Sequence, residues 1–278
     1  MKKLFITILF FATIFSSVSA DDFAKILVRA EKGNDKAQNA IADMYLNGDG
    51  VTPDYAQAAV WYEKSADRGN SEAQLKLGLM YESGCGVLQD YAKAMAWYQK
   101  SAAQGNMEAQ CCVGNMYYYG LGVVQDYTQA AAWYGKSADR GNAVAQCNLG
   151  CLYENGCGVV KDDAKAMALY RKAAKQGYAK AQKFIGDMYY KGCGVAIDYV
   201  KAVTWYRKAA DQDYVTAQYN LGYMYEYGYG VERDYSNAMM WYRAAADQGH
   251  AKAQKCYDRL AAQGCSSVKY PAEKDVVR

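Results

Sequence analysis

A repeating pattern of 36 residues constrains this chain more than any other feature. One copy runs from Ser71 to Asn106 and has the sequence SEAQLKLGLMYESGCGVLQDYAKAMAWYQKSAAQGN. The pattern returns without insertion or deletion in six copies, at residues 35–70, 71–106, 107–142, 143–178, 179–214 and 215–250. Self-similarity at a fixed period of this size is typical of solenoids, in which each unit packs against its neighbours. The sequence therefore predicts one repeat domain over residues 35–250.

Each copy contains two helical patterns separated by a short loop. In the copy quoted above, the apolar residues at positions 3, 7, 10 and 11 are spaced as on one face of a helix. Glycine at position 14, such as Gly84, can adopt the left-handed conformation that ends a helix. Aspartate at position 20, such as Asp90, can cap the second helix and favours the positive end of its dipole. These features predict an all-α fold, an α/α solenoid of stacked helix pairs.

The two ends of the chain depart from the repeat. Residues 1–20 resemble a signal peptide, with Lys2 and Lys3, an apolar run and the small residues Val18-Ser19-Ala20. We expect cleavage after Ala20 and export to the periplasm or the medium. Residues 21–34 match the second helix of a repeat and predict an N-terminal capping helix. Residues 251–263 predict a closing half repeat, and residues 264–278 a loose tail.

Composition limits the classes of partner. The formal net charge is +3, of which Lys2 and Lys3 contribute two units, so the mature protein is nearly neutral. That balance argues against nucleic acid as the main partner. No second apolar run reaches spanning length, which argues against stable membrane insertion. The G-x-GV loops lack the Lys-Ser/Thr of a phosphate-binding loop, so no cofactor is predicted.

Nine cysteines leave two disulfide pairings open. Cys157 and Cys193 share position 15 of the repeat, and Cys111 and Cys147 share position 5. Equivalent residues of stacked helices lie roughly 8–10 Å apart, whereas a disulfide needs Cα atoms within about 7 Å. Either bridge therefore requires the repeats to lean together, and the alternative is that these residues are small buried apolar groups. No CxxC occurs and His250 is the only histidine, so no metal site is predicted.

The pattern A-x-x-x-LG-x-MY-x-x-G-x-GV-x-x-D-x-x-x-A-x-x-WY-x-KAA-x-QG resembles the Sel-1-like repeat family, a relative of the tetratricopeptide repeat. The resemblance implies stacked antiparallel helix pairs in a right-handed superhelix. It also implies an adaptor for protein complexes, since most members have that role. Exported bacterial members act in envelope assembly and host interaction.

One cysteine-rich branch of this family, from Helicobacter, is described as penicillin-binding with weak β-lactamase activity. That branch pairs a cysteine late in the second helix with one early in the next helix. Here the corresponding positions hold Ala66 and Gln74, and likewise in the later repeats. A serine hydrolase also needs a histidine base, and His250 sits at a helix junction. No catalytic residue is therefore predicted, and β-lactam binding or hydrolysis is kept as an alternative function.

Positions 5, 9, 12 and 13 of the first helix vary most between repeats. They cluster on the helix face opposite positions 3, 7, 10 and 11, and in related superhelices that face lines the concave groove. Tyrosine is favoured at interfaces because it offers large area at small entropic cost. We expect this surface to bind a protein or peptide partner, and an alternative is a cell-wall glycan stacked on tyrosine rings. The candidate residues are Tyr118, Tyr119, Lys183, Asp187, Tyr190, Tyr219, Tyr223 and Tyr227.

Overall fold

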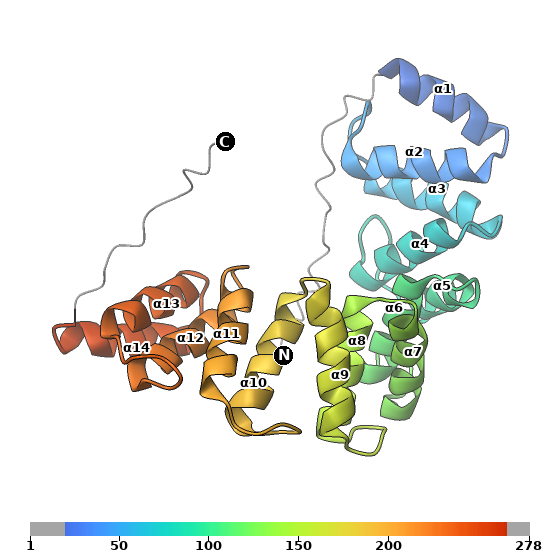
Figure 1. Ribbon diagram of the computed structural model, residues 1–278. Helices are drawn as coiled ribbons and strands as arrows, with labels where there is room; N and C mark the ends of the chain where they lie inside the picture. The colour runs from blue at the N-terminus through green and yellow to red at the C-terminus, as the bar shows by residue number, and fades with distance from the viewer. Residues whose placement is uncertain (1–19, 266–278) are drawn as a thin grey trace. The chain divides into compact units, whose positions relative to one another are not determined.

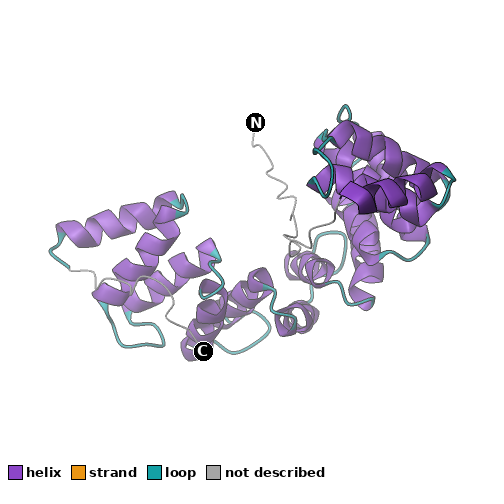
Figure 2. Cartoon of the chain, turned by 90° about the horizontal axis from the view of Figure 1, so that it is seen from above, coloured by secondary structure: helices purple, strands orange, loops and turns teal. Residues whose placement is uncertain are grey.

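The structure, a computed structural model, describes residues 20–265, which form helices joined by loops and turns (Figures 1 and 2). No strand occurs within this range, which confirms the predicted all-α repeat fold. The chain divides into two compact units, residues 1–140 and 141–278. The first contains α1 (Ala20–Glu31), α2 (Asp35–Asn47), α3 (Tyr55–Asp67), α4 (Ser71–Ser83), α5 (Tyr91–Ala103), α6 (Met107–Tyr119) and α7 (Tyr127–Asp139). The second contains α8 (Ala143–Asn155), α9 (Asp163–Lys175), α10 (Ala179–Lys191), α11 (Tyr199–Ala210), α12 (Val215–Tyr227), α13 (Tyr235–Asp247) and α14 (Ala251–Ala262).

Each repeat is a pair of short helices whose ends are set by local residues. The side chain of Asp90 accepts a hydrogen bond from the Lys93 backbone N–H at 2.9 Å, which caps α5. Gly84 ends α4 with φ of 74°, in the left-handed region. Asn70 caps α4 in the same way that Asp90 caps α5, with its side chain 3.0 Å from the Ala73 N–H. This second cap, at position 36 of the repeat, was not assigned from the sequence.

The two helices of a repeat meet through a buried tyrosine and a small residue. The Tyr98 ring of α5 is fully buried and lies against Gly78 of α4. A Cβ placed on Gly78 would be 2.6 Å from Cδ1 of Tyr98, closer than packed atoms tolerate. Glycine at position 8 therefore allows an aromatic ring to lie directly on the backbone of the first helix.

Glutamines connect the two helices of a repeat and also connect the first helix to the preceding repeat. Gln74 donates its amide hydrogen to the carbonyl of Ala66 at 2.9 Å, and its side-chain oxygen accepts from Gln104 at 2.8 Å. The equivalent glutamine pairs are Gln176 with Gln146, Gln212 with Gln182 and Gln248 with Gln218, at 2.8–3.0 Å. Repeats one and three have Arg68 and Arg140 in place of the donor glutamine. In those repeats the buried oxygens of Gln38 and Gln110 have no hydrogen-bond partner among the described residues.

The predicted signal peptide lies outside the described residues, except for Ala20, with which α1 begins. Most of the predicted loose tail, residues 266–278, also lies outside them. Within residues 20–265, no helix is long and apolar enough to cross a membrane.

Candidate functional site

Every repeat buries one tyrosine of its second helix, and the hydroxyl of that tyrosine bonds to a polar side chain of the first helix. The acceptor alternates along the chain between position 9 and position 12. The donor–acceptor pairs are Tyr62–Asp43 (2.5 Å), Tyr98–Glu82 (2.5 Å), Tyr134–Asn115 (2.7 Å), Tyr170–Glu154 (2.6 Å), Tyr206–Asp187 (2.8 Å) and Tyr242–Glu226 (2.8 Å). Buried hydroxyls and carboxylates need such partners, because an unpaired one loses its hydration without replacement.

This pairing explains much of the variation that the sequence analysis attributed to partner binding. Where position 9 holds the acceptor, position 12 is free to hold Leu46, Tyr118 or Tyr190. Where position 12 holds the acceptor, position 9 holds Leu79, Cys151 or Tyr223. Only one of the two positions in each repeat is thus available for another role. The exchange of a polar residue between positions 9 and 12 was visible in the sequence and was the signal for these pairs.

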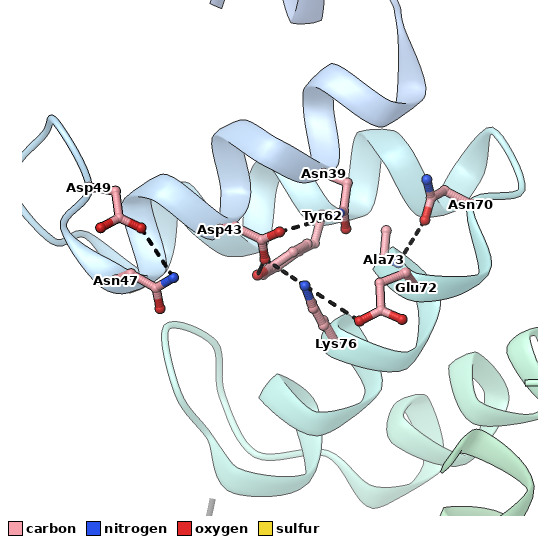
Figure 3. A network of polar contacts seen from close by, with 9 residues as sticks. All are labelled: Asn39, Asp43, Asn47, Asp49, Tyr62, Asn70, Glu72, Ala73 and Lys76. Atoms are coloured by element: carbon pink, nitrogen blue, oxygen red, sulfur yellow. Dashed lines mark hydrogen bonds and ion pairs between the residues drawn. The ribbon is translucent and has the colours of Figure 1, made fainter. Parts of the chain in front are cut away.

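Several of these acceptors also connect one repeat to the next. Asp43 lies between the Tyr62 hydroxyl and the ammonium of Lys76, which is 2.7 Å away and also approaches Glu72 (Figure 3). Arg259 donates to Glu226 across the last junction at 2.6 Å, and this contact raises the pKa of the guanidinium. Polar contacts therefore run along the first helices of neighbouring repeats.

Burial shifts the pKa of the acidic residue in a pair that has no neighbouring cation. Burial raises the pKa of Glu82, and the hydrogen bond from Tyr98 acts in the opposite direction. Burial likewise raises the pKa of the Tyr98 hydroxyl, which therefore stays protonated and donates.

An open pocket of about 300 Å³ lies between α10 and α12 in the second unit. Five of the residues predicted for the partner-binding surface line it, namely Lys183, Asp187, Tyr190, Tyr219 and Tyr223. The remaining lining residues are Lys191, Tyr206, Asn220 and Met224. Side chains from equivalent positions of two successive repeats thus meet around one opening.

The charges of the pocket are partly neutralised within it. Lys183 forms an ion pair with Asp187 at 2.5 Å. Asp187 is 8% exposed and also accepts from the Tyr206 hydroxyl and, at 3.3 Å, from the Asn220 amide. Asp187 is therefore part of the pocket frame. Lys191 is exposed and adds a cation at the edge.

Tyrosines extend the pocket into an aromatic surface, which we call the tyrosine cluster: Tyr190, Tyr199, Tyr223, Tyr227 and Tyr229. Their ring centroids lie 4.6–6.4 Å apart in seven pairs. Burial, with the neighbouring hydroxyls, raises the pKa of Tyr190 to about 12. Tyr227 is 50% exposed. The cluster is thus an aromatic surface that solvent reaches at Tyr227.

The other predicted residues lie elsewhere. Tyr118 and Tyr119 belong to the first unit, where Tyr118 contacts the rings of Tyr119 and Tyr127 at 4.8 and 5.3 Å. All nine cysteines are thiols, so the structure contains neither the Cys157–Cys193 nor the Cys111–Cys147 bridge.

His250 has a structural role at a helix junction. Its Nδ1 accepts from the Ala253 N–H at 3.1 Å and caps α14. Its ring centroid lies 4.7 Å from that of Tyr219, with the two planes tilted by 30°. Among residues 20–265, no group of three or more His, Cys, Asp or Glu side chains is arranged to hold a metal ion.

The described residues form a helical repeat protein, in which helix pairs recur and asparagine and aspartate side chains cap the first and second helices. A pocket opens between the first helices of two successive repeats, α10 and α12. The sequence pattern of the Sel1 repeat matches residues 35–70, 71–106, 108–142, 143–178, 179–214 and 215–250. The chain belongs to the Sel1 repeat family. A comparison with curated protein sequences finds no match.

Two solved structures are similar over most of this chain. One is c5321, a protective antigen present in uropathogenic Escherichia coli strains, which displays an SLR fold, with 36% identity and a TM-score of 0.78 over 90% of this chain. This chain covers 54% of that protein. The other is a Sel1 repeat protein from Oxalobacter formigenes, with 32% identity and a TM-score of 0.77, covering 81% of this chain and 90% of that one.

Proposed function

We propose that this Sel1 repeat protein is a scaffold that binds a protein or peptide partner through the pocket between α10 and α12. The observation that supports this function most strongly is the convergence of Lys183, Tyr190, Tyr219 and Tyr223 on one open pocket. These residues come from two successive repeats, and they occupy positions that the repeat frame does not need for capping or helix pairing.

The pocket and the tyrosine cluster suit a short segment of a partner protein. A volume of about 300 Å³ is at the lower end of ligand sites, so one large side chain fills it. Tyrosine rings provide apolar area for that side chain and hydroxyls for the partner backbone. The Lys183–Asp187 ion pair is satisfied internally, so binding need not leave a buried charge without a partner.

We further propose that the protein acts outside the cytoplasm, in the periplasm or the medium. The support is the signal-peptide pattern of residues 1–20. Cell fractionation followed by N-terminal sequencing tests this point. A mature chain that begins at Asp21 in the exported fraction is expected, and a chain retained in the cytoplasm with its first twenty residues would contradict it.

Selection from a random peptide library displayed on phage tests the binding function. Peptides enriched on the wild-type protein should bind Tyr190→Ala and Tyr223→Ala about 30-fold more weakly or worse, the loss typical of an interface hot spot. Tyr235→Ala is the matched control, because Tyr235 is 39% exposed and lies outside the pocket. Helical content by circular dichroism shows whether each variant remains folded.

Three outcomes would reject the proposed function. The first is the absence of any enriched peptide, and the second is equal binding by the two pocket variants and the control. The third is turnover of nitrocefin by the purified protein, which would favour the β-lactam alternative. Retention on purified peptidoglycan that Tyr223→Ala abolishes would instead identify a glycan as the occupant of the same surface.

A further inference from the structure

Two cysteines lie one helical turn apart on α8, away from the pocket residues. Cys147 is fully buried, Cys151 is half-buried, and the thiol of Cys147 hydrogen-bonds to the thiol of Cys151. They occupy positions 5 and 9 of the fourth repeat, the one repeat of the six with cysteine at both. Residues four apart on a helix face the same side, so the two sulfurs are held together by the helix itself.

Polar groups surround this pair. The Tyr170 hydroxyl lies 3.4 Å from Sγ of Cys151 and donates its proton to Glu154 at 2.6 Å. The hydrogen bond from Cys147 is the main cause that lowers the pKa of Cys151, the ammonium of Lys180 also lowers it, and burial acts in the opposite direction. Cys147 keeps the shared proton, and its own pKa is raised.

We propose that Cys147 and Cys151 form a two-coordinate thiolate site for the soft monovalent ion Cu(I). Soft thiolates select Cu(I) over harder cations. Two metal–sulfur bonds of roughly 2.3 Å each, the length found for zinc thiolates, require sulfurs little further apart than two hydrogen-bonded thiols. Binding forms two Cu–S bonds and releases the two thiol protons to solvent. Lys180 offsets the negative charge of the resulting complex.

The donor set also distinguishes Cu(I) from zinc. A structural zinc site needs four ligands, and residues 20–265 contain no group of three or more candidate ligands. Glu154 is already engaged by Tyr170. Two thiolates suffice for Cu(I), so the site is expected to discriminate against zinc by ligand number.

The third repeat provides a matched comparison. Cys111 occupies the same position 5 as Cys147 and is also buried. Position 9 of that repeat is Asn115, which accepts from the Tyr134 hydroxyl. Cys112 is adjacent in sequence, and neighbouring residues on a helix do not face one another. Cys111 therefore lacks the second thiol one turn away.

Anaerobic titration of the reduced full chain with Cu(I), using bicinchoninate as the competing chromophore, tests the site. The wild-type protein should bind one equivalent whose affinity falls at least about 100-fold in Cys147→Ala and in Cys151→Ala, because losing a ligand costs more than losing its outer-shell support. Cys111→Ala should retain that equivalent. Thermal melting of each variant reports whether it is folded, and Cys151→Ala, at the half-buried position, tests the site if Cys147→Ala does not fold.

Two results would overturn the proposal. One is unchanged Cu(I) affinity in folded Cys151→Ala. The other is an equal loss of affinity in Cys111→Ala, which would show that copper binds to the cysteines without regard to their arrangement.

Discussion

Replacement of Tyr98 by phenylalanine removes one hydroxyl from the centre of the second repeat. Tyr98 is fully buried, Glu82 is 8% exposed, and the hydroxyl lies 2.5 Å from the carboxylate. A hydrogen bond to a charged group contributes about 1.5–3 kcal/mol to stability, and removing the donor leaves the buried carboxylate without it. We therefore expect Tyr98→Phe to lower the free energy of unfolding by about 1.5–3 kcal/mol near neutral pH.

The same structure predicts how this loss depends on pH. Burial already raises the pKa of Glu82 in the folded protein, and without Tyr98 that pKa should rise further. A carboxyl group whose pKa is higher in the folded protein than in the unfolded chain makes its full contribution to stability below the unfolded pKa, which is about 4.3 for Glu. That contribution is lost as the pH rises through the pKa of the folded protein. The cost of Tyr98→Phe should therefore be larger at about pH 8 than at about pH 4.5, because a larger fraction of Glu82 is protonated and uncharged at the lower pH.

Urea denaturation followed by far-ultraviolet circular dichroism at the two pH values measures these differences. Glu82→Gln in the Tyr98→Phe background should recover most of the loss at the higher pH, because the amide carries no charge. Tyr55→Phe is the control, since Tyr55 is 43% exposed, and should change stability by less than about 0.5 kcal/mol. A cost of Tyr98→Phe that is the same at both pH values, or that persists undiminished with Glu82→Gln, would refute the reasoning.

Five further substitutions test three other features of the fold by the same denaturation measurement. Arg68→Gln and Arg140→Gln should each raise stability by about 0.5–1.5 kcal/mol, because the new glutamine supplies the missing donor to a buried glutamine oxygen. The reverse change, Gln104→Arg, should lower stability. If neither Arg68→Gln nor Arg140→Gln raises stability, the glutamine pairing is contradicted. Gly135→Ala in the middle of α7 should raise stability by about 0.5–1 kcal/mol, because no atom beyond the adjoining backbone of the helix lies within 4 Å of the added Cβ. A loss of stability would show an unfavourable contact there. Asp90→Ala should cost about 1 kcal/mol through the lost cap on α5, and a neutral result would mean that the cap does not contribute.

Local features of this protein were predictable because each depends on a few neighbouring residues. The period, the glycines at position 14 and the aspartates at position 20 determine where helices begin and end, and the structure has those helices. Backbone conformation and capping act over one turn of helix, so they can be inferred without knowing what packs where. The cap by Asn70 could have been inferred by the same argument, since asparagine precedes the first helix in four repeats.

The candidate pocket was only partly predictable. Variation between repeats indicated the helix face that lines it, and five of the predicted residues do meet there. Variation did not distinguish Asp187, which the buried Tyr206 requires as an acceptor, from Tyr190, which no buried group requires. A hydroxyl donor 19 residues away decides that role, and the exchange between positions 9 and 12 does not identify this donor until the two helices are paired.

The sequence by itself determined the repeat, the helix boundaries and the Sel1 family, because these follow from periodicity and from interactions within a few residues. The sequence shows that a polar residue alternates between positions 9 and 12, but only the tertiary structure showed that this residue accepts from the buried tyrosine and leaves the other position for a partner. The physical reason is that burial and hydrogen-bond pairing are properties of two helices brought together. The 36-residue pattern specifies that the helices meet, but their packing assigns each variable side chain its partner.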